Sequence, residues 1–68
     1  MIVHFKTTIE AIDNLTSMGF EMLDESGHVY WKPGYKASIH PIRGSEMVMV
    51  AYSEAQGRPV LMYEVKGQ

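Results

Sequence analysis

The chain contains no cysteine, and this absence excludes both disulfide bonds and thiolate-bound zinc as sources of stability. Its 68 residues allow one domain with one core. A domain this short buries only about 60% of the surface that its unfolded chain exposes, so it usually needs a disulfide, a metal or an oligomer. Of these, oligomerisation is the means of stabilisation that remains available.

Long apolar runs are also missing. No stretch approaches the roughly 18 apolar residues of a membrane span. Residues 1–6 lack the apolar run of a signal peptide, so we expect a cytoplasmic protein, either of the producing cell or of a host. An excess of positive charge is absent too, because the formal net charge of −2 gives no general attraction to nucleic-acid phosphates.

The element that the sequence predicts most clearly is a helix over residues 8–18. Thr7 and Glu10 have the spacing of a capping box, in which each side chain accepts a backbone N–H near the start of the helix. Gly19 is suited to the left-handed conformation that ends a helix. Apolar residues recur at helical spacing on the face that we expect to be buried: Ile9, Ile12, Leu15 and Met18, with Ala11 beside them.

Outside the helix, the apolar pattern has the period of two that is typical of strands. We expect turns at 25–27, at Pro33-Gly34 and at 43–45. The strands that we expect are 1–5, 20–24, 28–32, 35–40 and 46–53. The order β-α-β-β-β-β predicts one α+β domain over residues 1–68, an antiparallel sheet with one amphipathic helix packed on one face.

The C-terminal third carries apolar residues on both faces of its strands. Segments 46–53 and 59–66 flank a turn at 55–58, which predicts a hairpin. With a four-residue loop, one face carries Val48, Val50, Tyr52, Leu61, Tyr63 and Val65, and the other carries Met47, Met49, Ala51, Val60 and Met62. One short helix covers only one side of a sheet, so one of these faces needs other cover. A sheet that curls on itself, a homodimer and a different protein would each supply it.

An apolar sheet face that the helix cannot cover predicts a small non-enzymatic module that binds a larger protein or a second copy of itself. We expect its contact residues to be Val48, Val50, Tyr52, Leu61, Tyr63 and Val65. Acidic residues would steer a basic partner: Glu10, Asp13, Asp24 and Glu25. Small acidic domains of this kind are common among phage and mobile-element accessory proteins, so the role that we expect is that of a regulator or inhibitor.

Motifs for catalysis or for a cofactor are missing. His4, His28 and His40 do not have the spacing of metal ligands. If Pro33-Gly34 forms a two-residue loop, His28 and His40 point to opposite faces of the sheet. The chain has no nucleophile elbow and no phosphate-binding glycine motif. We therefore expect no metal, no cofactor and no enzymatic activity.

Nucleic-acid binding is a second hypothesis. Aromatic and basic residues alternate around the predicted Pro33-Gly34 turn, and such residues on a sheet can stack on bases. The residues concerned are Tyr30, Trp31, Lys32, Lys36 and Arg43. Trp31 has two other roles open to it, as a core residue or as the anchor of a protein interface.

Residues 8–41 support a third hypothesis. After the predicted helix the chain reads Gly19-Phe20, Ser26-Gly27-His28, Val29-Tyr30-Trp31, Pro33-Gly34 and Ser38-Ile39-His40-Pro41. This order resembles the HicA-type messenger-RNA interferase toxins. The resemblance implies a double-stranded-RNA-binding-like scaffold, and it implies that His28 takes the place of the family's catalytic histidine in general acid–base cleavage of RNA.

Overall fold

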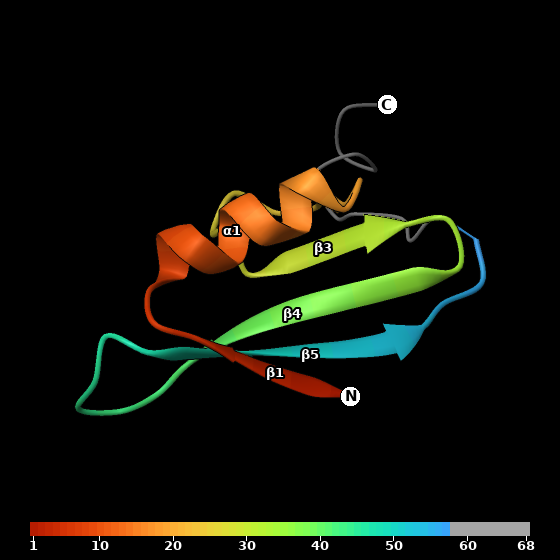
Figure 1. Ribbon diagram of the computed structural model, residues 1–68. Helices are drawn as coiled ribbons and strands as arrows, with labels where there is room; N and C mark the ends of the chain where they lie inside the picture. The colour runs from red at the N-terminus through yellow and green to blue at the C-terminus, as the bar shows by residue number, and fades with distance from the viewer. Residues whose placement is uncertain (58–68) are drawn as a thin grey trace.

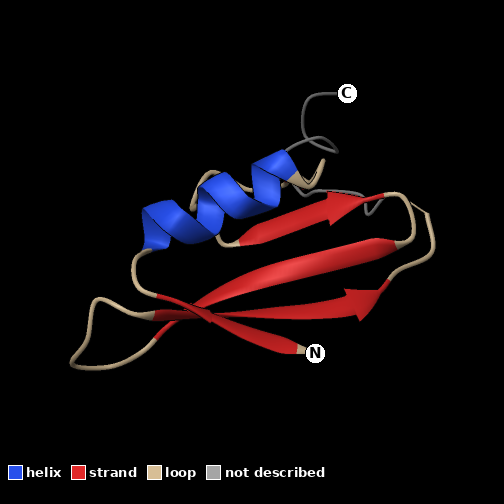
Figure 2. Ribbon diagram, viewed as in Figure 1, coloured by secondary structure: helices blue, strands red, loops and turns tan. Residues whose placement is uncertain are grey.

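The computed structural model describes residues 1–57 of the chain (Figure 1). Its elements are β1 (Ile2–Phe5), α1 (Thr8–Ser17), β2 (Glu21–Met22), β3 (Val29–Lys32), β4 (Tyr35–Pro41) and β5 (Val48–Glu54). The strands form one antiparallel sheet, and α1 lies on one of its faces (Figure 2). The α+β fold expected from the sequence is thereby confirmed. The strand expected over 59–66 lies outside the described residues.

The strands are arranged in the order β1-β5-β4-β3-β2. The first strand of the chain therefore pairs with the last described strand, with Phe5 opposite Val48. Consecutive strands pair in the rest of the sheet, and Lys32 lies opposite Tyr35 across the two-residue Pro33-Gly34 turn that the sequence predicts. Within residues 1–57, β1 and β2 form the two edges of an open sheet.

The start and the end of α1 depend on local hydrogen bonds. The Thr7 hydroxyl oxygen accepts the Glu10 N–H at 3.2 Å, and the Glu10 carboxylate accepts the Lys6 N–H at 3.3 Å. The second bond reaches one residue further back than the capping box predicts. Gly19 has a φ of 93° and ends the helix, and the Phe20 N–H then donates to the Leu15 carbonyl at 3.0 Å.

The buried face of α1 differs from the one expected. Ala11 and Leu15 are completely buried, whereas Ile9 is 71% exposed and Met18 is also exposed. Ile9 precedes Ala11 by two residues, which places it about 200° around the helix from Ala11. Because Ala11 has a small side chain, α1 can lie close to the sheet along the line through Ala11 and Leu15, and this contact turns Ile9 toward solvent.

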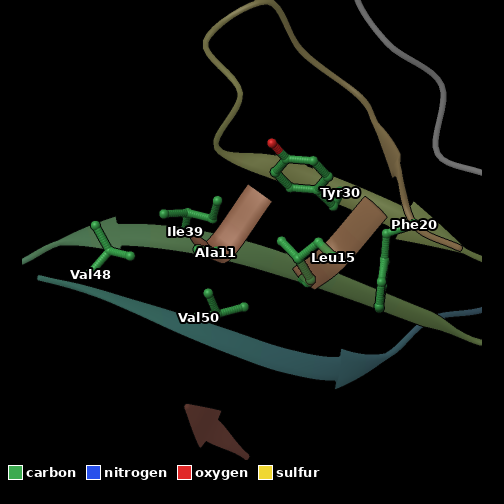
Figure 3. Packing of buried hydrophobic residues seen from close by; sticks show 8 residues of the cluster. Ala11, Leu15, Phe20, Tyr30, Ile39, Val48 and Val50 are labelled. Carbon is green, nitrogen blue, oxygen red and sulfur yellow. The ribbon is translucent and has the colours of Figure 1, made fainter. Parts of the chain in front are cut away.

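The core lies between α1 and the sheet (Figure 3). The buried residues around Leu15 come from the loop after the helix and from three strands: Phe20, Tyr30, Ala37, Ile39, Val48 and Val50. Val48 and Val50, which the sequence predicted as contact residues, are 2% and 0% exposed. This corrects that prediction, because α1 covers their face of the sheet. Tyr52 is half-buried at the margin of the core.

Candidate functional site

The face of the sheet opposite α1 is not covered by any helix of the described residues, and we call it the open face (Figure 1). Side chains alternate between the faces of a strand, so the residues that alternate with the core residues belong to the open face. They are Ile2 and His4 of β1, Met49, Ala51 and Ser53 of β5, Lys36, Ser38 and His40 of β4, and Val29 and Trp31 of β3. The open face is thus the side of β5 that carries Met49 and Ala51, the second of the two apolar faces between which the sequence did not decide.

One row of side chains crosses four strands of the open face. Ile2 lies opposite Ala51, Ala51 opposite Ser38, and Ser38 opposite Val29. The outer members of the row are large and apolar, and Ile2 is 59% exposed and Val29 38% exposed. The inner members, Ser38 and Ala51, are small. The row therefore has two raised apolar ends with a depression between them.

This depression, which we call the central hollow, has a volume of about 300 Å³. It exists because small side chains occupy adjacent positions on β4 and β5. Its lining residues are Val29, Lys36, Ala37, Ser38, Ala51, Tyr52 and Ser53. A hollow of this kind can receive one apolar or aromatic side chain of a partner, with the Lys36 ammonium and the serine hydroxyls as polar groups at its rim.

Two of the three histidines lie on the open face. His4 and His40 are both opposite Met49, one on each side of β5. The Ser38 hydroxyl and His40 Nε2 share a hydrogen bond of 2.8 Å. His28 precedes β3, and its carbonyl accepts the Ile39 N–H at 2.8 Å. This bond places His28 opposite Ile39, a core residue, and therefore on the side of α1. The prediction that His28 and His40 face opposite sides is confirmed. Across residues 1–57, no three histidine or acidic side chains are grouped so that they could hold a metal ion.

The residues proposed for nucleic-acid binding do not share one surface. Tyr30 is buried in the core, which corrects its role as a base-stacking residue. Lys32 lies on the α1 side, where its Nζ donates to the Met18 carbonyl at 3.1 Å and sits 4.8 Å from the centre of the Phe20 ring. Only Trp31 and Lys36 of this set lie together on the open face, opposite each other. Arg43 is exposed in the loop between β4 and β5.

Trp31 is half-buried near the end of the described chain. Its indole N–H donates to the Gly57 carbonyl at 2.8 Å, which brings Gly57 next to β3. Of the three roles considered for Trp31, burial in the core beneath α1 is excluded, since its ring belongs to the opposite face of the sheet from Tyr30.

The turn before β3 contains Asp24, Ser26 and His28, three residue types that also occur together in catalytic sites. Here the Ser26 hydroxyl donates to the Asp24 carboxylate, which also accepts the Val29 N–H at 3.2 Å. The Ser26 oxygen accepts the backbone N–H of His28 at 3.3 Å. The Ser26 hydroxyl, with the backbone N–H groups, lowers the pKa of Asp24. His28 takes part in these bonds through its backbone N–H. The Asp24 carboxylate accepts hydrogen bonds from Ser26 and Val29, and these bonds stabilise the turn.

The four acidic residues expected to steer a partner fall into two groups. Glu10 and Asp13 line a shallow groove beside β1, together with Phe5, Asn14 and Ser17. Asp24 and Glu25 lie in the turn before β3. The other expected contact residues, Leu61, Tyr63 and Val65, lie outside the described residues, and Tyr52 lines a separate apolar cavity at the C-terminal end of α1.

Comparisons with known proteins add no relative. No family model matches the sequence, and no similar protein was found among curated proteins or among solved structures. The resemblance of residues 8–41 to HicA-type toxins therefore stays a prediction. None of the helices in residues 1–57 has the length and the apolar character needed to cross a membrane.

The central hollow was not predicted from the sequence. Two sequence features nevertheless indicate part of its lining. The alternation of Lys36, Ser38 and His40 marks one face of β4, and the Pro33-Gly34 turn places that face beside Val29. Ile2 lies beside these residues only because β1 pairs with β5, and no local sequence pattern indicates that pairing.

Proposed function

We propose that the protein is a small non-enzymatic module that binds a larger protein through the open face. The observation that carries this proposal is the central hollow, which the exposed apolar side chain of Val29 lines and which lies next to Ile2, the residue opposite Ala51. Interfaces of this type combine a shaped apolar centre with a polar rim, and one anchoring side chain usually supplies much of the binding energy.

The charge of the open face favours a protein over a nucleic acid. Lys36 is its one lysine or arginine among the described residues, and Glu21 lies opposite Trp31 at the β2 edge. Binding to nucleic acid depends mainly on several cationic contacts to phosphates, and the formal net charge of the chain is −2. A partner protein needs no such excess of positive charge.

In the role that we propose, occupancy of a surface is itself the function. By covering a surface of its partner, the protein would regulate or inhibit that partner without chemistry. Its small size and acidic balance fit an accessory protein, as the sequence suggested.

The substitution Ala51→Arg tests the proposal, because it places a long charged side chain in the central hollow. Ala51 is half-buried on a strand face that has room for the new side chain, so we expect the fold to persist. Loss of an anchoring contact weakens binding by about 2 kcal/mol or more, which corresponds to roughly 30-fold. Thr16→Arg is the matched control, because it adds the same charge on the exposed side of α1.

The measurement is quantitative mass spectrometry of proteins that co-purify with tagged wild type, Ala51→Arg and Thr16→Arg from the native cells. We expect at least one protein to be retained by the wild type and by Thr16→Arg and lost with Ala51→Arg. Identical sets of proteins from all three forms would contradict binding through the open face.

A further inference from the structure

The two edges of the sheet differ in how well they are protected. An edge strand leaves backbone N–H and C=O groups unpaired, and proteins usually shield such edges with short strands, charges, proline or bulges. β2 follows this rule, since it has two residues and one of them is Glu21. β1 has four residues, IVHF, with no acidic, lysine, arginine or proline residue, and it pairs with β5 in an uninterrupted register.

The outer edge of β1 presents backbone groups of Ile2 and His4. Met1 and Tyr52 form a hydrogen-bonded pair, in which the Tyr52 N–H donates to the Met1 carbonyl at 2.9 Å. Hydrogen-bonded and non-hydrogen-bonded pairs alternate along an antiparallel ladder, so Val3 and Phe5 also bond to β5. The N–H and C=O groups of Ile2 and His4 therefore point away from β5, and no described residue lies beyond β1 in the sheet.

The side of α1 above this edge is acidic. Glu10 and Asp13 line the shallow groove between α1 and Phe5, where Asn14 and Ser17 complete the lining. Neither carboxylate forms an ion pair with a described residue, and the one hydrogen bond that either accepts within residues 1–57 is from the Lys6 N–H to Glu10. A strand added beside β1 would lie about 4.8 Å away from it, with every second side chain directed toward this groove.

These two features select the partner. A second copy is disfavoured, because pairing β1 with β1 about a two-fold axis would bring the acidic flanks of both α1 helices together. An extended segment with lysine or arginine at alternate positions can pair with the outward backbone groups of β1 and also place positive charges beside the acidic groove. We propose that β1 binds an extended basic segment of a partner protein by strand addition, with the basic side chains facing Glu10 and Asp13. This edge site does not depend on the open face.

Nuclear magnetic resonance titration of the isotope-labelled protein tests the proposal directly. The probe is a synthetic peptide of about nine residues in which lysine and threonine alternate, a length that spans the edge with room to spare. The control peptide carries glutamate in place of lysine. We expect the lysine peptide at millimolar concentration to shift the amide signals of Ile2, His4 and Asp13, and the glutamate peptide to leave them unchanged.

Two variants test separately how the backbone hydrogen bonds and the acidic charge contribute to peptide binding. His4→Pro removes an outward N–H without removing a bond to β5, and we expect the shifts at Ile2 to disappear. Asp13→Lys should weaken binding of the lysine peptide roughly three- to tenfold, the effect of losing and then reversing one exposed charge. Glu25→Lys is the control, because it makes the same change of charge in the turn before β3.

Three results would overturn the proposal. They are equal shifts with both peptides, unchanged binding by Asp13→Lys, and amides of Ile2 and His4 that are already protected from hydrogen exchange in the free protein. Ala51→Arg adds a side chain on the open face, next to Ile2, and leaves the outward backbone groups of β1 and the acidic residues on the α1 side in place. The lysine peptide should therefore bind this variant as it binds the wild type. Failure at the edge is thereby distinguishable from failure at the open face.

Discussion

The assignment of a covered and an open face depends on how α1 docks, and Leu15→Ala tests this docking. Leu15 is completely buried between α1 and the sheet, beside Tyr30 and Val50 (Figure 3). Its replacement by alanine removes about three buried carbon groups, worth about 0.8 kcal/mol each in transfer free energy. The cavity that remains raises the expected loss to about 3–5 kcal/mol.

This loss is large for a chain of 68 residues, for which a typical free energy of unfolding is about 3–10 kcal/mol. The matched control is Ile9→Ala, on the same helix at a site that is 71% exposed. We expect this control to change the free energy of unfolding by less than about 0.5 kcal/mol, since alanine also has the higher helix propensity.

Urea unfolding followed by far-ultraviolet circular dichroism measures both variants. The position of Ile9 at helical spacing with Leu15 is the reason that sequence analysis placed both on the buried face. If Ile9→Ala were as costly as Leu15→Ala, α1 would be rotated relative to the docking described here. The assignment of Val50 as covered and Ala51 as open would then lose its basis.

Two further predictions concern Tyr30 and Asp24. The Tyr30 hydroxyl is buried and has no hydrogen-bond partner among the described residues, and burial, followed by the charge of Asp24, raises its pKa. Tyr30→Phe should therefore leave the free energy of unfolding unchanged or raise it by up to about 1 kcal/mol, and a loss larger than about 1 kcal/mol in urea unfolding would show that the hydroxyl is satisfied. The Ser26 hydroxyl and backbone N–H groups lower the pKa of Asp24, so its stabilising contribution is present above the ordinary aspartate range near pH 4 and is lost as the pH falls through the lowered value. Asp24→Asn should lower stability at neutral pH and reduce its further loss toward low pH, and parallel acid dependence of variant and wild type would contradict this role.

Local features of the fold were predictable from the sequence. The Thr7 cap, Gly19 and the Pro33-Gly34 turn act through groups only a few residues apart, so the residues themselves carry the necessary information. The same is true of the alternation along β4, which separates Lys36 and Ser38 from the buried Ala37 and explains why the opposite faces of His28 and His40 were correctly predicted.

Which face of β5 is buried under α1 is decided by the tertiary structure. Val50 and Ala51 are adjacent apolar residues, and the apolar pattern of the segment is the same on both sides, so sequence analysis assigned the contact role to the residues that α1 in fact covers. The pairing of β1 with β5 joins residues nearly the whole described chain apart. It also places Ile2 beside the central hollow and leaves the edge of β1 next to Glu10 and Asp13.

The physical reason for this division is the range of the interactions. Caps and turns depend on hydrogen bonds within one segment, which the amino-acid sequence by itself determines. Burial depends on which distant surfaces meet, and for two equally apolar faces that choice is made only when α1, β1 and β5 pack together.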